Sequence, residues 1–283
     1  MIDLLGYVAP ASYDELWDVL DAADTPVVVC AGCTDLIPKA RAGLIKPAVW
    51  IDVRRLAPLR GLVLEPDRVV IGASVTHHEV VTTPWIAREI PALAAACGSV
   101  GSRQIRTRGT LGGNAANASP SADALLALNA LDAEVVLCSR AGSRHVPLTS
   151  FCTGPGATVL GRGEVIESFV VPRRLGRKAV FLKLGPRQAV AVAKVSVAAA
   201  ADVVDGRLRD VRIVMGSVAP TQIRVPEAES LVEGAVPDDA LLRRLDEVVA
   251  RSVRPIDDVR STARYRRIAS GVLARRAVAS LLG

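Results

Sequence analysis

Short apolar runs alternate with amphipathic segments over the first fifty residues, a pattern that predicts a small α/β unit. Ser12 and Glu15 have the spacing of a capping box, and the β-branched run at 26–30 is typical of a buried strand. The turn at residues 31–35 is then expected at the carboxyl end of that strand. In order along the chain, we expect an N-terminal strand, a helix over 12–22, a strand over 26–30, a helix over 35–42 and a strand over 49–53.

Two further regions follow, and the second has the pattern of an α+β unit, because its strands come before its helices. Residues 98–120 contain five glycines and show no periodicity, which predicts a long loop of the kind that often carries function. In the middle region, we expect two strands within 61–73, helices over 91–97 and 122–131, and a strand over 133–137. In the last region, we expect strands over 181–184, 190–204 and 208–214, and helices over 226–233, 238–251 and 260–282.

Composition limits the class of protein. Half of the 283 residues are apolar, which excludes a disordered chain and predicts a well-filled core in about two domains. Aromatic residues make up only 3%, too few for the stacking platform that binds single-stranded nucleic acid. The net charge of +6 comes largely from arginines, which gather after residue 251. Such a segment either binds an acidic partner, nucleic acid or an anionic membrane, or forms a solvated helix face.

Cysteine usage and the N-terminus bear on location. Five cysteines, an odd number, favour reduced thiols over a disulfide framework. The first ten residues lack a basic segment typical of a signal peptide. No uncharged apolar run reaches the roughly 18 residues that a membrane helix needs. We therefore expect a cytoplasmic protein with no membrane span.

Two loops have the composition of anion-binding turns. Residues 109–114 place adjacent glycines beside Thr110 and Asn114, so that backbone N–H groups and a side-chain amide can approach a phosphate closely. Residues 31–35 lie where a strand gives way to a helix, and the amides of a helix N-terminus favour an anion. Each loop alone is equally typical of an ordinary turn. Together they favour a dinucleotide cofactor.

Other chemistry-bearing residues have weaker patterns. Cys30 and Cys33 could form half of a zinc site or a redox pair, but no second ligand pair has suitable spacing, so we interpret the spacing as coincidental and Cys30 as a core thiol. His77 and His78 could not both bind one metal in a strand, where neighbouring side chains point apart. His78 and Glu79 could act as acid–base groups, but we interpret these residues as exposed at a helix start. The chain has no G-x-S-x-G motif. We therefore expect no metal site, whereas a Ser-His-Asp triad stays open from the residues alone.

Several segments resemble the FAD-binding medium subunit of molybdenum hydroxylases, the family of xanthine dehydrogenase and carbon monoxide dehydrogenase. Residues 31–36 resemble its A-G-G-T-D-L loop, and residues 101–123 resemble its second flavin loop almost throughout. Residues 151–156, 181–187 and 261–266 are similar to later segments of the same family. The resemblance covers essentially the whole chain, and the second loop is its most specific part.

The resemblance implies an α+β fold in which a two-subdomain FAD-binding domain, similar to that of vanillyl-alcohol oxidase, precedes a smaller domain of antiparallel sheet plus helices. It places the first domain at 1–175, divided into subdomains at 1–55 and 56–175, and the second at 176–283. It implies FAD as cofactor, with the flavin and not a side chain carrying the chemistry. The residues that it places around FAD are Val28, Val29, Cys30, Ala31, Gly32, Cys33, Thr34, Asp35, Val100, Thr110, Leu111, Gly112, Gly113, Asn114, Asp123, Ile166 and Lys183.

Specific roles follow from the same resemblance. Asp123 would bond ribityl or ribose hydroxyls, while Ile166 and Lys183 would lie near the flavin ring. A lysine there suits the chemistry, because a cation stabilises reduced flavin. The sequence departs from the family at Cys33, which replaces a glycine, and at Val100, where some relatives have an aromatic residue. Residues 191–193 lack the acidic group of the family's D-I-A triplet.

The implied function is electron transfer within a complex. A molybdopterin-binding large subunit would hydroxylate the substrate, and a [2Fe–2S] small subunit would pass electrons to this chain. The chain would pass them to NAD⁺ or another acceptor. Two alternatives stay open: a basic scaffold or nucleic-acid-binding protein that uses the arginine-rich C-terminus, and a stand-alone FAD oxidase of the vanillyl-alcohol oxidase type.

Overall fold

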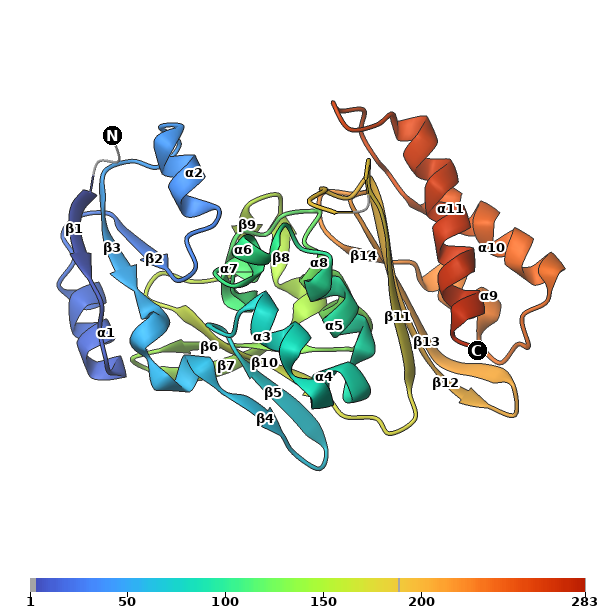
Figure 1. Ribbon diagram of the computed structural model, residues 1–283, viewed down its shortest axis with the longest axis horizontal. Coiled ribbons are helices and arrows are strands. Elements are labelled where there is room, and N and C mark those ends of the chain that lie inside the picture. The colour runs from blue at the N-terminus through green and yellow to red at the C-terminus, as the bar shows by residue number, and fades with distance from the viewer. Residues whose placement is uncertain (1–3, 188, 283) are drawn as a thin grey trace.

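Three sheets with their helices follow one another along the long axis of the molecule (Figure 1). The structure is a computed structural model, and it describes residues 4–187 and 189–282. The N-terminal unit lies at one end, the middle unit in the centre and the C-terminal unit at the other end (Figure 1). A fourth, two-stranded sheet formed by β8 (Cys152–Gly154) and β9 (Ala157–Thr158) lies in the middle unit.

The N-terminal unit is a three-stranded parallel sheet with strand order β1-β3-β2. The side chain of Ser12 accepts a hydrogen bond from the backbone of Glu15, so the predicted helix starts at the predicted cap. The elements predicted for the first fifty residues are confirmed. They are β1 (Leu4–Val8), α1 (Tyr13–Asp21), β2 (Val27–Cys30), α2 (Leu36–Arg41) and β3 (Ala48–Asp52), followed by the 3-10 turns η1 (Val53–Arg55) and η2 (Ala57–Arg60).

The middle unit is a five-stranded antiparallel sheet, covered by helices, whose central strand had no prediction from the sequence. In spatial order its strands are β4 (Leu62–Leu64), β5 (Arg68–Gly72), β10 (Val165–Pro172), β6 (Glu134–Ser139) and β7 (Gly142–Pro147). Its helices include α3 (His77–Thr82), α4 (Pro84–Glu89), α5 (Pro91–Gly98) and α8 (Asp123–Ala130), and the short turn η3 (Leu148–Ser150) follows β7. Every residue of α8 is buried, because this helix also contacts the C-terminal sheet.

Two sequence-based predictions are wrong in detail. The predicted loop at 98–120 contains two short helices, α6 (Arg103–Arg106) and α7 (Leu111–Ala116). Ser102 and Thr110 cap these helices with side-chain hydrogen bonds, so that α7 forms despite its two glycines. The strand predicted over 190–204 begins only at Val195, since the preceding stretch is irregular and leaves Val190 and Val192 exposed.

The C-terminal unit is a four-stranded antiparallel sheet with three helices on one side (Figure 1). Phe181, Ala198 and Val214 on its other side belong to the core of the middle unit, so the two units share one apolar interface. The strands are β11 (Lys178–Leu184), β12 (Val195–Val204), β13 (Arg207–Gly216) and β14 (Ile223–Arg224). The helices are α9 (Pro226–Val232), α10 (Asp239–Ser252) and α11 (Ala263–Ser280).

Candidate cofactor site

Two loops from different units meet backbone to backbone. We call residues 31–35 the first loop, residues 109–114 the second loop, and their line of contact the seam. A Cβ atom on Gly32 would lie 1.9 Å from the carbonyl oxygen of Arg108, and one on Gly109 would lie 3.4 Å from Oγ1 of Thr34. The first distance is far below van der Waals contact. The seam therefore requires glycine at position 32.

The second loop is fixed to the middle unit by backbone hydrogen bonds. The N–H of His77 donates to the carbonyl oxygen of Gly109 at 3.0 Å, and the N–H of Leu111 donates to that of Val75 at 2.9 Å. The N–H of Gly112 donates to Ala73 at 2.8 Å, where a Cβ on Gly112 would meet the Ala73 side chain at 2.7 Å. This pairing aligns the loop like an extra strand, so its remaining polar groups have defined positions.

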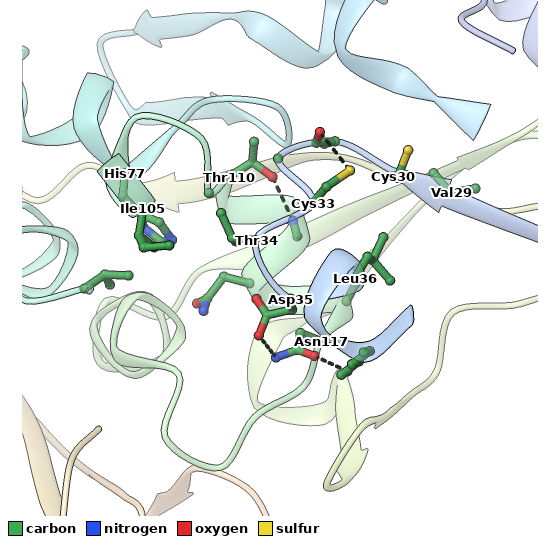
Figure 2. Close-up of a pocket in the computed structure, with 18 residues that line it drawn as sticks. Val29, Cys30, Cys33, Thr34, Asp35, Leu36, His77, Ile105, Thr110 and Asn117 are labelled. Carbon is green, nitrogen blue, oxygen red and sulfur yellow. Dashed lines mark hydrogen bonds between the residues drawn. The ribbon is translucent and has the colours of Figure 1, made fainter. Parts of the chain in front are cut away.

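A cavity of about 290 Å³ opens along the seam, and we call it the seam cavity. Figure 2 shows Cys33, Thr34 and Asp35 on one wall and Thr110, Ile105 and His77 on the other. The Oδ1 atom of Asn114 is buried in this wall without a hydrogen-bond partner. A buried unpaired amide oxygen costs about 1–3 kcal/mol, so a ligand donor is expected there.

Side chains also bridge the two loops at the edge of the cavity. Nδ2 of Asn117 donates to Oδ1 of Asp35 at 3.3 Å, and Nζ of Lys39 donates to Oδ1 of Asn117 at 2.6 Å (Figure 2). Asn117 begins no predicted element and was not among the predicted cofactor residues. Its position in the polar segment after Asn114 was the available signal.

A second cavity, of about 270 Å³, continues from the seam cavity, and we call it the apolar cavity. The two share part of their lining, including Ala31, Thr110 and Gly113. Beyond the shared part, the wall is mostly apolar and includes Val53, Leu160, Val165 and Ile166, but Ser74 and Glu164 also line it, and Glu164 is paired with Arg144. The combined site is therefore elongated, with polar backbone in its middle and an apolar end.

The structure brings most of the predicted cofactor residues to these two cavities. Val28 and Leu111 instead pack into cores beneath the loops, and Asp123 and Lys183 form an ion pair and line neither cavity. Of the predicted residues, Gly112 and Ile166 line the apolar cavity. Those that line the seam cavity are Val29, Cys30, Ala31, Gly32, Cys33, Thr34, Asp35, Val100, Thr110, Gly113 and Asn114. Sequence reasoning did not select Leu36, Lys39, His77, Ile105, Ala116 or Asn117.

His77 corrects one prediction, because it is only 2% exposed and not a solvated helix-start residue. It is the first residue of α3 and lines the seam cavity, with Nδ1 3.4 Å from Sγ of Cys97. Burial, and then the charge of Arg106, lowers the pKa of His77 to about 4. The imidazole is therefore neutral at physiological pH. The backbone pairing with Gly109, which no local pattern encodes, is what holds it inside.

Cys30 and Cys33 differ in environment. Cys30 is buried at the end of β2, as predicted. Cys33 has a φ of +59°, in the left-handed region, which explains why a glycine suits this position. A hydrogen bond from the Cys30 thiol lowers the pKa of Cys33 to about 7 and raises the pKa of Cys30. The Cys33 thiol lies in the wall of the seam cavity, with a pKa below that of an ordinary thiol.

An ion pair joins the middle and C-terminal units beside Val100. Nζ of Lys183 on β11 donates to Oδ2 of Asp123 at 2.5 Å and to the carbonyl oxygen of Ser99 at 3.1 Å. Oδ1 of Asp123 is buried and has no partner. Burial raises the pKa of Asp123, against the lowering effect of Lys183.

Ile166 and Lys183, both predicted near the flavin ring, do not lie together. Ile166 lines the apolar cavity, whereas Lys183 lines a shallow pocket with Arg187 and Ala191. Val100, the neighbour of Ser99, lines the seam cavity and not the apolar one.

Within residues 4–187 and 189–282, no group of three or more His, Cys, Asp or Glu side chains is placed to hold a metal ion. None of the helices in that part of the chain is both long and apolar enough to cross a bilayer.

Comparison with known proteins agrees with this geometry. Residues 3–174 match the FAD binding domain in molybdopterin dehydrogenase, and residues 180–281 match the CO dehydrogenase flavoprotein C-terminal domain. The glyceraldehyde dehydrogenase medium chain of Sulfolobus acidocaldarius is 31% identical over 271 residues, which cover 96% of each chain.

Solved structures agree over the same length. The carbon monoxide dehydrogenase of Hydrogenophaga pseudoflava contains a chain that superposes with a TM-score of 0.95 at 28% identity, over 99% of this chain and 98% of that chain. A chain of quinoline 2-oxidoreductase from Pseudomonas putida 86 superposes with a TM-score of 0.92 at 28% identity, over 98% of this chain and 96% of that chain. The predicted fold class is confirmed. The chain therefore belongs to the FAD-binding medium subunits of molybdopterin hydroxylase complexes, the family of the xanthine dehydrogenase and carbon monoxide dehydrogenase flavoproteins.

Proposed function

We propose that FAD lies across the seam, with its diphosphate against both loops. The observation that carries this assignment is the seam itself: two glycine-containing loops in direct contact, beside a cavity with the unpartnered Oδ1 of Asn114 in its wall. That oxygen would accept a hydrogen bond from a ribityl or ribose hydroxyl. The cap between Thr110 and the N–H of Gly113 holds the second loop ready for this contact.

The two ends of the site differ in a way that orients the dinucleotide. The apolar part of the wall, around Ile166 and Leu160, suits the flat apolar face of the adenine, because few charged residues line this cavity. The ring would then lie at the Val100 end, toward Lys183. Because Val100 is aliphatic, the ring would be held by backbone and aliphatic contacts. This orientation keeps the predicted role of Lys183 and reassigns Ile166.

Lys183 is suited to act on the ring through its charge. Its ammonium group has three N–H donors, and Ser99 and Asp123 take two of them. The third donor can face a ligand. A cation so placed favours the reduced, more negative form of a flavin. We therefore propose that the charge of Lys183 raises the midpoint potential of the flavin. The carboxylate of Asp123 partly neutralises that charge.

The proposed function of the chain is to relay electrons within a molybdenum hydroxylase complex. Bound FAD supplies the capacity to accept single electrons from a [2Fe–2S] subunit and to deliver a pair to NAD⁺ or another acceptor. The chain's own residues bind and orient the cofactor and exclude water. A molybdopterin-binding large subunit and a [2Fe–2S] small subunit are the proposed partners. Relatives named as medium chains of glyceraldehyde and carbon monoxide dehydrogenases support this assignment.

The test uses the chain purified together with its partner subunits. Gly113→Val should abolish flavin retention, because Gly113 lines both cavities and its added Cβ would meet only Oγ1 of Thr110, at 3.0 Å. The variant fills the site without disrupting a core, so its circular dichroism should match that of the parent. Unchanged flavin content in Gly113→Val would contradict the placement. Reduction of NAD⁺, quinone and O₂ by the same complex then identifies the acceptor.

A basic scaffold is the second candidate, and the ion pairs of the C-terminal arginines count against it. Arg260 and Arg266 both bind Asp258, and Arg275 binds Asp246 at 3.2 Å. Arg266 is 1% exposed and so cannot contact a phosphate backbone. The scaffold predicts DNA binding that weakens steeply with salt. Flat binding curves at low salt would exclude it.

A stand-alone oxidase of the vanillyl-alcohol oxidase type is the third candidate function. Such an enzyme needs its own substrate cap and catalytic residues. The helices of the C-terminal unit instead pack on the face of its sheet away from the seam (Figure 1). Substrate-dependent flavin reduction by the chain without partners would support the oxidase.

A further inference from the structure

A third cavity, of about 290 Å³, lies behind Thr110 and is lined by three arginines. We call it the arginine cavity. Arg54 comes from η1, Arg60 from the end of η2, and Arg108 from the residue before the second loop. None of these three lines the seam cavity or the apolar cavity. The rest of its lining is Ser74, Val75, Thr76, Glu79, Thr107 and Thr110.

The charges in this cavity are unevenly compensated. Arg54 is paired with Asp52 at 2.6 Å. Within residues 4–187 and 189–282, no carboxylate forms an ion pair with Arg60 or Arg108. Glu79 is the one acidic side chain in the described lining, and its Oε2 atom accepts hydrogen bonds from the backbone and side chain of Thr76. One oxygen of its carboxylate is therefore used in capping α3, and neither Arg60 nor Arg108 is paired with it in the described part of the chain.

Ser74 gives a second, independent indication of a ligand. Ser74 lines both the arginine cavity and the apolar cavity, the residue is only 8% exposed, and within residues 4–187 and 189–282 its Oγ atom has no hydrogen-bond partner. Its backbone is fixed, because its N–H donates to the carbonyl oxygen of Leu59 at 2.7 Å. A buried hydroxyl without a partner costs about 1–3 kcal/mol, so the position favours a bound acceptor.

We infer that the arginine cavity binds a phosphoryl anion, separate from the diphosphate of FAD. Arginine side chains and a hydroxyl donor are the groups that recognise a phosphate with several acceptor oxygens. The recessed shape favours a small anion over an acidic side chain on a flat partner surface. The volume admits a phosphate ester of a small sugar as well as inorganic phosphate. Thr110 and Ser74 connect this cavity to the cofactor site, so an anion here would brace the second loop from behind.

The test is calorimetric titration of the flavin-loaded complex with inorganic phosphate, at an ionic strength held constant with chloride. We expect saturable binding of about one phosphate per chain. The double variant Arg60→Gln/Arg108→Gln should weaken it by about tenfold or more, because each removed partner is a charged hydrogen-bond donor. The matched control is Arg243→Gln/Arg244→Gln, which removes the same charge from exposed positions on α10. Flavin absorbance should stay unchanged in both.

Ser74→Ala gives an independent readout with a minimal change of shape. It should weaken phosphate binding without loss of the fold. Tighter binding of ribose 5-phosphate than of phosphate, with none by ribose, would identify a sugar phosphate as the ligand; the reverse order would identify free phosphate. Either order supports the site. Absence of saturable binding, or equal weakening by both arginine double variants, would overturn it, while an intact flavin signal would leave the cofactor assignment standing.

Discussion

Lys183 and Asp123, which are sixty positions apart, form an ion pair that joins the C-terminal sheet to the first turn of α8. Their side chains are 14% and 5% exposed, so the pair is largely desolvated. A second hydrogen bond from Lys183 reaches Ser99, directly before Val100. This contact brings a strand of the C-terminal unit to the end of the cofactor site. Both the stability of the interface and the electrostatics of the site therefore depend on one pair.

Lys183→Met should destabilise the chain by about 3 kcal/mol, because it leaves a buried carboxylate unpaired. The double variant Lys183→Met/Asp123→Asn should recover much of that loss. Urea unfolding measures both effects. Lys178→Met is the matched control, because Lys178 is an exposed residue at the start of the same strand. A double variant no more stable than Lys183→Met would show that the pair is not the source of the loss.

The same pair should shift the flavin potential in opposite directions. Lys183→Met removes a cation and should lower the midpoint potential, whereas Asp123→Asn leaves that cation uncompensated and should raise it. Redox titration of the bound flavin measures both. Lost stability with no change in potential would mean that the pair only holds the two units together.

Gly32→Ala should force the two loops apart and cause loss of bound flavin, because the added Cβ would lie 1.9 Å from the carbonyl oxygen of Arg108. We expect less than about a tenth of the parent flavin content, with a stability loss of about 1–3 kcal/mol from overpacking. Gly61→Ala is the control, because its nearest new contact is at 3.8 Å. The absorbance of the purified complexes measures the effect. Full flavin content in Gly32→Ala would show that the seam can open without consequence.

Cys33→Gly should stabilise the chain by about 0.5 kcal/mol. Relief of the left-handed backbone contributes about 1–2 kcal/mol, and the greater entropy of glycine in the unfolded chain offsets part of it. Flavin content should remain at the parent level. Urea unfolding of the reduced proteins measures the difference. A loss of stability above 1 kcal/mol would mean that the thiol makes a packing contribution larger than its backbone strain.

His77 should make stability depend on pH above the range of the carboxylates. Its pKa is about 4 in the fold, against an ordinary value of 6.5, so between these values the unfolded chain takes up a proton that the fold does not. The contribution of His77 to the free energy of unfolding is fully present above pH 6.5. It is lost as the pH falls towards 4, by about 3 kcal/mol in total.

Urea unfolding between pH 7 and 5 measures this loss. His77→Gln should flatten the slope, whereas His145→Gln, at an exposed position on β7, should leave it unchanged. Equal slopes in the parent and in His77→Gln would contradict the role of burial.

Local chemistry made the two loops predictable. A turn with Gly32 at a strand end, and a glycine pair beside Thr110 and Asn114, are each as typical of an ordinary turn as of an anion site, and it was their occurrence together and the family resemblance that pointed to a cofactor. Pairing across long distances was not predictable in the same way. The burial of His77 depends on its bond to Gly109, and the position of Lys183 depends on how two units pack. Local patterns do not encode such contacts.

The errors in secondary structure have the same origin. Helix α7 contains two glycines and has low intrinsic propensity, yet it forms because Thr110 caps it and the adjoining backbone pairs with residues 73–77. The apolar alternation at Val190 and Val192 is typical of a strand, but both side chains are exposed. Periodicity does not distinguish a buried strand from an apolar surface segment.

The central claim is that FAD lies across the seam between the two loops, and the most direct measurement is the flavin content of the complex. We expect about one FAD per chain in the parent, read from its absorbance, and almost none in Gly113→Val with the same secondary structure. A correctly folded parent complex without a flavin band would contradict the account. So would a Gly113→Val complex that retains its full flavin content.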